Sequence, residues 1–260
     1  MAAFNWFWKA MGTSSERNNK KSKSIVTGSE GLVEQLSLLD DAELAARARA
    51  CAAGGVLEDK STFLACLAVA AQRKLGLKPY HVQSQAVLRL LEGDVIQMAT
   101  GEGKTLVGAM AATGFALTGK RVHVVTVNNY LASRDAEWMR PLVETFGLSV
   151  ASVTEKLSAD ERRSAYRSDI IYAPVNELGF DVLRDNQITA REQAVQTPAD
   201  VALVDEADSV LVDEALVPLV LAGSRKGDAP TGQITDVVSR LRANIDYHIS
   251  QDGRTVALSD

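Results

Sequence analysis

Residues 98–105 read Met-Ala-Thr-Gly-Glu-Gly-Lys-Thr, after an apolar run and before a long helix-like segment. Glycines in such a loop let backbone N–H groups turn toward one point, where they can surround an anion. A helix that begins after the loop adds the positive end of its dipole. The stretch predicts a phosphate-binding loop, with Met98 where the general pattern has glycine. A glycine turn that only starts a helix is the alternative.

The residues of this loop have separate expected roles. Lys104 can reach the β- and γ-phosphates of a nucleotide, and the Thr105 hydroxyl can bind Mg²⁺. The nucleotide-binding residues expected in the loop are Gly101, Glu102, Gly103, Lys104 and Thr105.

A second motif, Asp205-Glu206-Ala207-Asp208, follows the apolar run Val201–Val204. A carboxylate at the end of a strand is the expected second partner of nucleotide-bound Mg²⁺. Asp205 would hold the metal directly or through water, and Glu206 would orient and deprotonate the attacking water. Because an acidic cluster after a strand is more often a solvated loop, this hypothesis depends on the phosphate loop upstream.

Short apolar runs alternate with helical stretches from Leu77 onward. The expected strands are Asp94–Ala99, Val122–Val127, Asp169–Ala173 and Val201–Val204. Strands that alternate with helices predict an α/β fold with a mostly parallel sheet covered on both faces. Ligands of such sheets bind at the carboxyl ends of the strands.

Residues 30–76 are expected to be helical. Asp40 or Asp41 can cap a helix that runs to about Ala50, and Ser61 or Thr62 can cap the next one. Gly76 stands where a helix-ending glycine belongs. Trp138 and Phe146, at helical spacing further on, are expected in the core.

After Ser224 the pattern changes again. Residues 225–232 predict a loop, and a helix face follows it, formed by Ile234, Val237, Val238 and Leu241. The end predicts a hairpin, Tyr247–Ser250 with Thr255–Leu258, around Asp252-Gly253. We interpret this region as the start of a second domain.

Composition limits the function classes. Of 260 residues, 46% are apolar and 23% charged, as in an ordinary soluble globule, and the net charge of −5 argues against a basic nucleic-acid binder. The uncharged apolar stretch Thr105–Gly119 is shorter than the ~20 residues that span a bilayer. With no signal peptide evident and only Cys51 and Cys66, we expect a cytoplasmic protein and no protein-only metal site.

The first 29 residues combine aromatic and basic side chains. The aromatic residues are Phe4, Trp6, Phe7 and Trp8, and the basic ones are Lys9, Arg17, Lys20, Lys21 and Lys23. Such a segment suits an anionic phospholipid surface. A frayed tail whose aromatic residues dock on the body of the protein is the alternative.

The two motifs together resemble those of helicase-like motor ATPases. In that superfamily a glutamine before the first strand reads adenine, and a side-chain amide offers adenine both a donor and an acceptor. Gln83 stands at the matching position, with Gln85 as the rival.

Three longer blocks narrow the resemblance to SecA, the ATPase that drives preproteins through the Sec channel. They are residues 122–135, residues 176–186 (Asn-Glu-Leu-Gly-Phe-Asp-Val-Leu-Arg-Asp-Asn) and residues 204–215, and the similarity covers about residues 8–260. The resemblance implies ATP and Mg²⁺ as ligands and peripheral association with the cytoplasmic face of the cell membrane. It implies preproteins, the Sec channel and anionic phospholipid as partners; a homodimer is left open and no nucleic acid is expected.

The resemblance also implies a domain organisation. Residues 1–29 would form a basic, aromatic N-terminal segment and residues 30–76 a helical region. Residues 77–222 would form the first of two RecA-like motor lobes, and residues 223–260 the beginning of an inserted preprotein-binding domain. The arginines that the second lobe supplies in this family have no counterpart motif here, so we expect poor hydrolysis by this chain alone.

One departure from the family is Leu216-Val217, where SecA usually has Arg-Thr. It predicts an accessory paralogue with a narrower export role. The competing interpretations are a DEAD-box-type RNA or DNA helicase and a non-catalytic adaptor that docks on a membrane or channel. The charge and the three blocks count against the helicase, and the presence of Lys104, Thr105, Asp205 and Glu206 counts against the adaptor.

Overall fold

The computed structural model describes residues 14–220, 232–243, 245–249 and 256–259. The chain divides into two compact units, one up to Leu219 and one from Val220. The expected loop over residues 225–232 falls almost wholly outside the described residues, as do the aromatic residues of the N-terminal segment.

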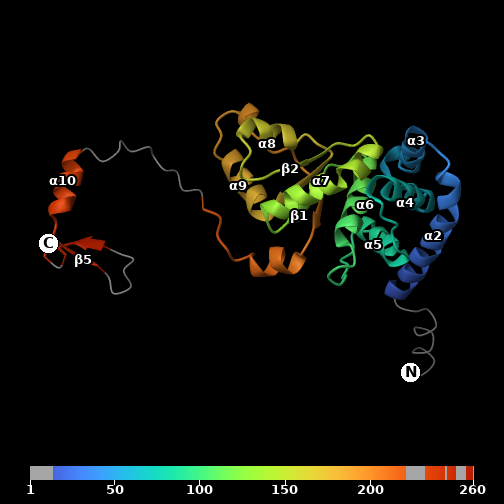
Figure 1. Cartoon of the computed structure of the whole chain (residues 1–260), viewed down its shortest axis with the longest axis horizontal. Helices are drawn as coiled ribbons and strands as arrows, with labels where there is room; N and C mark the ends of the chain where they lie inside the picture. Colours follow the sequence, from blue (N-terminus) through green and yellow to red (C-terminus); the bar gives the residue numbers. More distant parts are fainter. Residues whose placement is uncertain (1–13, 221–231, 244, 250–255, 260) are drawn as a thin grey trace, which may run out of the picture. The chain divides into compact units, whose positions relative to one another are not determined.

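The described part of the first unit begins with four helices that pack together and against the helices of the sheet region (Figure 1). They are α2 (Ser14–Leu36), α3 (Asp41–Cys51), α4 (Lys60–Leu75) and α5 (His81–Leu91), with a short 3-10 helix at Ala53–Gly55. Leu44, Phe63 and Met110 are fully buried in the core that these helices share with α6 (Lys104–Leu117).

Local sequence sets the ends of these helices. Asp40 caps α3 by accepting from the N–H of Glu43, whose carboxylate accepts from the N–H of Asp40, so that prediction is confirmed. Gly76 ends α4 with φ +68°, also as expected. The predicted cap of α4 is wrong: Asp59 accepts from the N–H of Thr62, because a carboxylate before the first turn reaches that N–H.

The sheet has four parallel strands in the order β2-β3-β1-β4. The strands are β1 (Val122–Thr126), β2 (Val150–Ser152), β3 (Ile170–Pro174) and β4 (Val201–Val204). Three of the four predicted strands are therefore confirmed, and β2 was not predicted because it is only three residues long.

The strand predicted over Asp94–Ala99 is wrong for this structure. The stretch pairs with no strand among the described residues, and the Val95 side chain is 95% exposed. A β-strand needs a neighbour to accept and donate its backbone hydrogen bonds, and among the strands that the structure describes β4 pairs only with β1. An apolar run is therefore not sufficient for a strand.

Helices cover both faces of the sheet. One face, which includes Val124 and Tyr172, packs against α6 and α7 (Asn129–Thr145). The other face, which includes Ile171 and Ala173, packs against Tyr166 and Leu178, from the region of α8 (Ala159–Ala165) and α9 (Val175–Asp185).

Phe146, at the end of α7, is buried as expected. Trp138 is 48% exposed, so its predicted core position is wrong. The register of α7 explains this, because its buried side carries Ala132, Ala136 and Met139 and leaves Trp138 on the outer side.

A buried ion cluster joins α8 to α9. The Arg162 guanidinium donates to Glu177 at 2.6 Å and to Asp181 at 2.8 Å, and all three side chains are almost fully buried. Burial alone would lower the pKa of Arg162, but the bonds to Glu177 and Asp181 outweigh it and raise the pKa. Tyr166 Oη, at the end of α8, also donates to Asp181 at 2.9 Å, so the cluster fixes α9 against α8.

The second unit contains α10 (Gly232–Arg240) and an antiparallel pair, β5 (Tyr247–Ile249) and β6 (Val256–Leu258). The predicted helix is confirmed as far as Arg240, so Leu241 lies just beyond it, and the hairpin strands are confirmed over β5 and β6. Ser250, Thr255 and the expected turn at Asp252-Gly253 lie outside the described residues. Across both units, no described helix combines the length and the apolar character that a membrane crossing needs.

Replacing Arg162 with Met should lower the free energy of unfolding by about 3–5 kcal/mol, because the buried Glu177 would lose its cation and Asp181 would keep only the partly exposed Arg184 as its cation. Urea denaturation of the protein measures this change. Lys74→Met is the matched control: its ion pair with Asp41 is partly exposed, so the loss should stay below about 1 kcal/mol. Equal losses in the two variants would contradict a dominant role for the buried cluster.

Candidate functional site

The glycine-rich loop turns sharply before α6. Gly101 has φ +86° and Gly103 has φ +79°, a left-handed backbone that favours glycine. The loop is closed by Glu102, whose N–H donates to Ala99 O at 3.3 Å and whose carboxylate accepts from Ala99 N at 2.9 Å. Lys104 and Thr105 are the first residues of α6, so both stand at the positive end of its dipole.

Gln83 is bonded to this loop. Its Nε2 donates to Glu102 O at 2.7 Å, and its Oε1 accepts from Tyr80 N at 2.8 Å. The side chain is 6% exposed, and a neutral amide still has one N–H and one lone pair for another partner. The rival Gln85 has a buried Nε2 with no hydrogen-bond partner among the described residues. The adenine-reading role of Gln83 stays a prediction.

Chain topology brings the two motifs to the same edge of the sheet. Helix α6 packs against β1 and β4, and a short connection joins its last residue to the first residue of β1. The helix therefore runs antiparallel to β1, and its first residue, Lys104, lies toward the carboxyl end of the strand. Asp205 follows β4, a parallel neighbour of β1, so it lies at that same end.

This edge is also where the direction of chain winding changes. The strands β2 and β3 lie to one side of β1, whereas β4 lies on its other side. In open α/β sheets, ligands bind outside the carboxyl ends of strands at such a switch point. The carboxyl ends of β1 and β4 are therefore the expected position for a ligand.

The backbone after β4 is strained at Glu206. Asp205 N donates to Val125 O at 2.9 Å and extends the ladder by one bond, and Glu206 N donates to Asp205 Oδ1 at 3.0 Å. Glu206 has φ +53°, the one positive φ of a non-glycine residue among the described residues. Ser209–Asp213 then forms a π-helical turn. Such strain and such turns gather at functional sites.

These features suit a nucleotide with a divalent cation. The loop backbone and the α6 N-terminus favour phosphate, and Lys104 makes no ion pair with any described residue. Thr105 and Asp205 supply the hydroxyl and carboxylate oxygens that Mg²⁺ prefers. Glu206 is exposed and adjacent to Asp205, where a water-activating base is needed.

Sequence reasoning missed two buried polar groups near Asp205. Asp135 on α7 is 6% exposed, and burial raises the pKa of its carboxyl, with a further contribution from the charge of Asp205. Burial also raises the pKa of Tyr172 on β3, where the charges of Asp135 and Asp205 add to the effect. The helical spacing of Ala132, Asp135 and Ala136 was a usable signal, since it puts a carboxylate on an apolar face.

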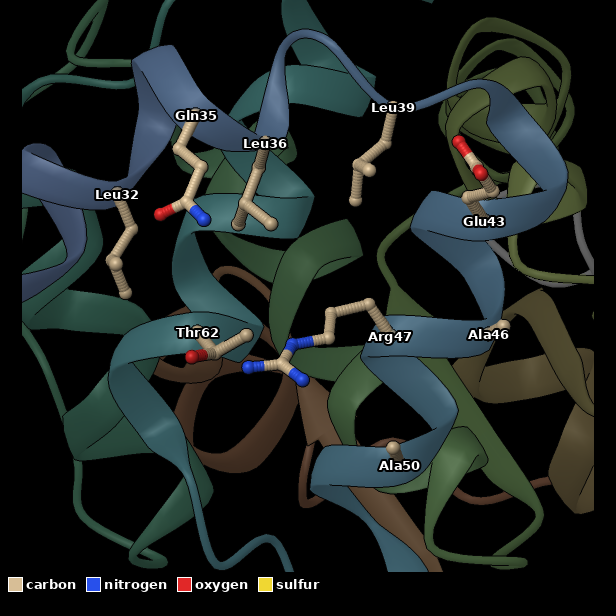
Figure 2. Close-up of a pocket in the computed structure, with 9 residues that line it drawn as sticks. All are labelled: Leu32, Gln35, Leu36, Leu39, Glu43, Ala46, Arg47, Ala50 and Thr62. Atoms are coloured by element: carbon tan, nitrogen blue, oxygen red, sulfur yellow. The ribbon is translucent and has the colours of Figure 1, made fainter.

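A groove of about 580 Å³ lies between α2, α3 and α4. Figure 2 shows Arg47 reaching across it toward Thr62, with leucine side chains along one wall. The groove contains none of the predicted site residues. It offers a single cation and few other polar groups, so it is not where a triphosphate would be expected.

The sheet order, the glycine-rich loop before α6 and the acidic pair after β4 define this unit as a RecA-like lobe of the P-loop motor type. Comparison with protein families matches residues 7–256 to the SecA DEAD-like domain. The chain therefore belongs to the SecA family.

Individual relatives agree with this assignment. The chain is 66% identical, over its whole length, to a protein translocase subunit SecA 2 of Corynebacterium glutamicum (strain R), covering 34% of that protein. It is 61% identical to the corresponding protein of Corynebacterium efficiens, again over its whole length and 34% of the relative. It is 50% identical to the protein translocase subunit SecA of Mycobacterium avium (strain 104), with 98% of the chain and 33% of the relative covered. The chain spans about a third of the length of these relatives.

Gly103→Ala should destabilise the protein more than Gly101→Ala. Both positions have a left-handed backbone, which costs about 1 kcal/mol for alanine. A Cβ at Gly103 would also collide with the Gln83 amide, whereas one at Gly101 meets nothing within 4 Å. Urea denaturation should therefore show a larger loss for Gly103→Ala, by about 1–2 kcal/mol. Equal losses would show that Gln83 moves aside freely.

Proposed function

We propose that this chain is the nucleotide-binding part of a SecA-type ATPase, which couples ATP hydrolysis to the passage of preproteins through the Sec channel. The observation that carries the proposal is the phosphate-binding loop at the carboxyl edge that also carries Asp205 and Glu206, in a chain of the SecA family. Residues 77–222 would be the first motor lobe, and residues 223–260 the beginning of the preprotein-binding domain. Residues 30–76 would be a supporting helical region.

In this proposal the residues have separate tasks. Lys104 and the backbone of Gly101–Gly103 bind the phosphates of ATP, and Gln83 contacts the adenine. Thr105 and Asp205 hold Mg²⁺, which when bound screens the charge of the phosphate oxygens. Glu206 takes a proton from water as its oxygen bonds to the γ-phosphorus, and the bond to the β-phosphate oxygen breaks to give ADP and phosphate.

Partners and location follow from the family and the N-terminal composition. The SecA names of the relatives support preproteins and the Sec channel as partners. The basic, aromatic residues 1–29 support contact with anionic phospholipid at the cytoplasmic face of the cell membrane. Leu216-Val217 in place of Arg-Thr, and the similarity to proteins named SecA 2, support an accessory export role.

ATP turnover by the full-length protein tests this function. One sample contains unfolded preprotein with membranes that hold the channel, and the other contains single-stranded RNA. Stimulation by the first alone supports the translocase. Stimulation by RNA alone would replace it with the helicase, and absence of nucleotide binding would favour the adaptor.

Lys104→Ala in the full-length protein should abolish productive ATP binding, because the phosphates lose their cation. Glu206→Gln should keep ATP bound and lower turnover by at least about 100-fold, because an amide accepts no proton from water. Nucleotide titration and single-turnover hydrolysis measure the two effects. Lys120→Ala and Glu192→Gln, both away from the loop, are the matched controls and should behave like the unchanged protein. Normal turnover by Glu206→Gln would refute its role as the base.

Replacing Trp6 and Trp8 with Ala should weaken binding to anionic vesicles, because aromatic rings anchor a basic segment at the lipid interface. Each lost ring should reduce the vesicle-bound fraction in co-sedimentation. Trp138→Ala is the control, since this tryptophan is partly exposed and belongs to α7, outside the N-terminal segment. Unchanged co-sedimentation of the double variant would rule out the membrane contact.

A further inference from the structure

We propose that Tyr172 and Asp135 are positioning residues for the nucleotide-binding edge, linked to Asp205 through a buried water molecule. The inference rests on the proposed function, because it gives Asp205 its role in binding Mg²⁺. It assigns a task to two polar groups that the mechanism above leaves unused.

Tyr172 presents a buried hydroxyl without a partner in the described part of the chain. The residue lies on β3 opposite Val124 of β1, is 3% exposed, and packs with Ala132 and Ala136 of α7. No described residue lies within hydrogen-bond reach of its Oη. Buried polar groups in native proteins are almost always paired with protein or with ordered water, so the hydroxyl indicates a water site.

Tyr166 is a buried tyrosine of the same lobe whose hydroxyl does have hydrogen-bond partners. It is as deeply buried as Tyr172, but its Oη donates to Asp181 at 2.9 Å and lies 3.3 Å from the Gln196 amide nitrogen. The fold can therefore supply protein partners to a buried phenol, and the described residues supply none to Tyr172.

Asp135 provides an acceptor on the same buried side of α7. It stands between Ala132 and Ala136, the two residues that pack with Tyr172. Both of its bonds from Arg134 end on Oδ1, at 2.8 Å from Nε and 2.7 Å from the terminal nitrogen. The other oxygen, Oδ2, remains available as an acceptor.

Asp205 is the third member of the group. It follows β4, which is separated from β3 only by β1. Its charge raises the pKa of both Asp135 and Tyr172, although burial is the larger cause in each case. Val124 of β1 lies opposite both Tyr172 and Leu203 of β4, and Asp205 stands two residues beyond Leu203, so Asp205 and Tyr172 belong to the same face of the sheet.

One water molecule satisfies all three groups. It accepts from Tyr172 Oη and donates one hydrogen to Asp135 Oδ2 and the other to Asp205, which gives the three bonds that a buried water usually makes. The bond to Asp205 would hold its carboxylate in one orientation before Mg²⁺ arrives. The strand β3 and the helix α7 would thereby support the metal-binding residue without touching the nucleotide.

Tyr172→Phe in the full-length protein tests the link, because it removes only the hydroxyl. The Mg²⁺ concentration for half-maximal binding of a fluorescent ATP analogue should rise about three- to tenfold, while the melting temperature of the nucleotide-free protein stays equal or rises. Tyr166→Phe is the matched control. It should lower the melting temperature, because Asp181 loses a donor, and leave the Mg²⁺ dependence unchanged.

Asp135→Asn should shift the Mg²⁺ dependence in the same direction. Because both residues act through one water, the double variant with Tyr172→Phe should be no worse than the more affected single variant. Additive shifts, or no shift with Tyr172→Phe, would overturn the link and leave Tyr172 with a packing role.

A high-resolution crystal structure of the nucleotide-free protein separates this inference from the proposed function. It should show an ordered water within hydrogen-bond distance of Tyr172 Oη and Asp135, which is lost in Tyr172→Phe. If that water is missing, the inference is wrong even when the protein binds ATP. If the water is present but the protein binds no nucleotide, the proposed function fails instead.

Discussion

Parallel pairing of β1 with both β3 and β4 is the constraint on which the rest of this lobe depends. Parallel strands must all end at one edge, and each crossover helix must begin near that edge. The loop before α6 and the acidic pair after β4 are a hundred residues apart in sequence, yet this rule alone brings them to the same side of the sheet. The short side chains on the buried face of α7, such as Ala132 and Ala136, let that helix lie close against β3.

Much of this arrangement could be predicted from sequence because its determinants are local. The Asp40 cap, the Gly76 terminus and the apolar runs of β1, β3 and β4 depend on neighbours a few residues away. The candidate site was predictable for the same reason, since its loop and acidic pair are contiguous motifs. Its chemical assignment remains a prediction, because the structure places these residues but does not test their roles.

Most of the features that sequence did not predict depend on distant partners. The run Asp94–Ala99 has strand composition, but composition cannot provide a pairing neighbour. The cluster of Arg162 with Glu177 and Asp181 joins residues 15 and 19 positions apart on two helices, so its existence depends on how α8 and α9 pack. Trp138 faces outward because the small residues of α7 fill the narrow space against the sheet.

Buried charge serves two different purposes in this lobe. The Arg162 cluster is complete within the protein: its guanidinium pairs with two carboxylates, and Arg184 also pairs with Asp181, so the cluster fixes α9 against α8. Asp135 is matched only on one oxygen, by a partly exposed arginine, and lies near the carboxylate of Asp205. A cluster whose charges are already paired is not stabilised further by a ligand. Repulsion between neighbouring carboxylates, in contrast, decreases when a cation binds beside them. Asp135 and Asp205 are therefore the groups whose energy depends on a bound nucleotide and its cation. The Arg162 cluster provides the rigid support beside them.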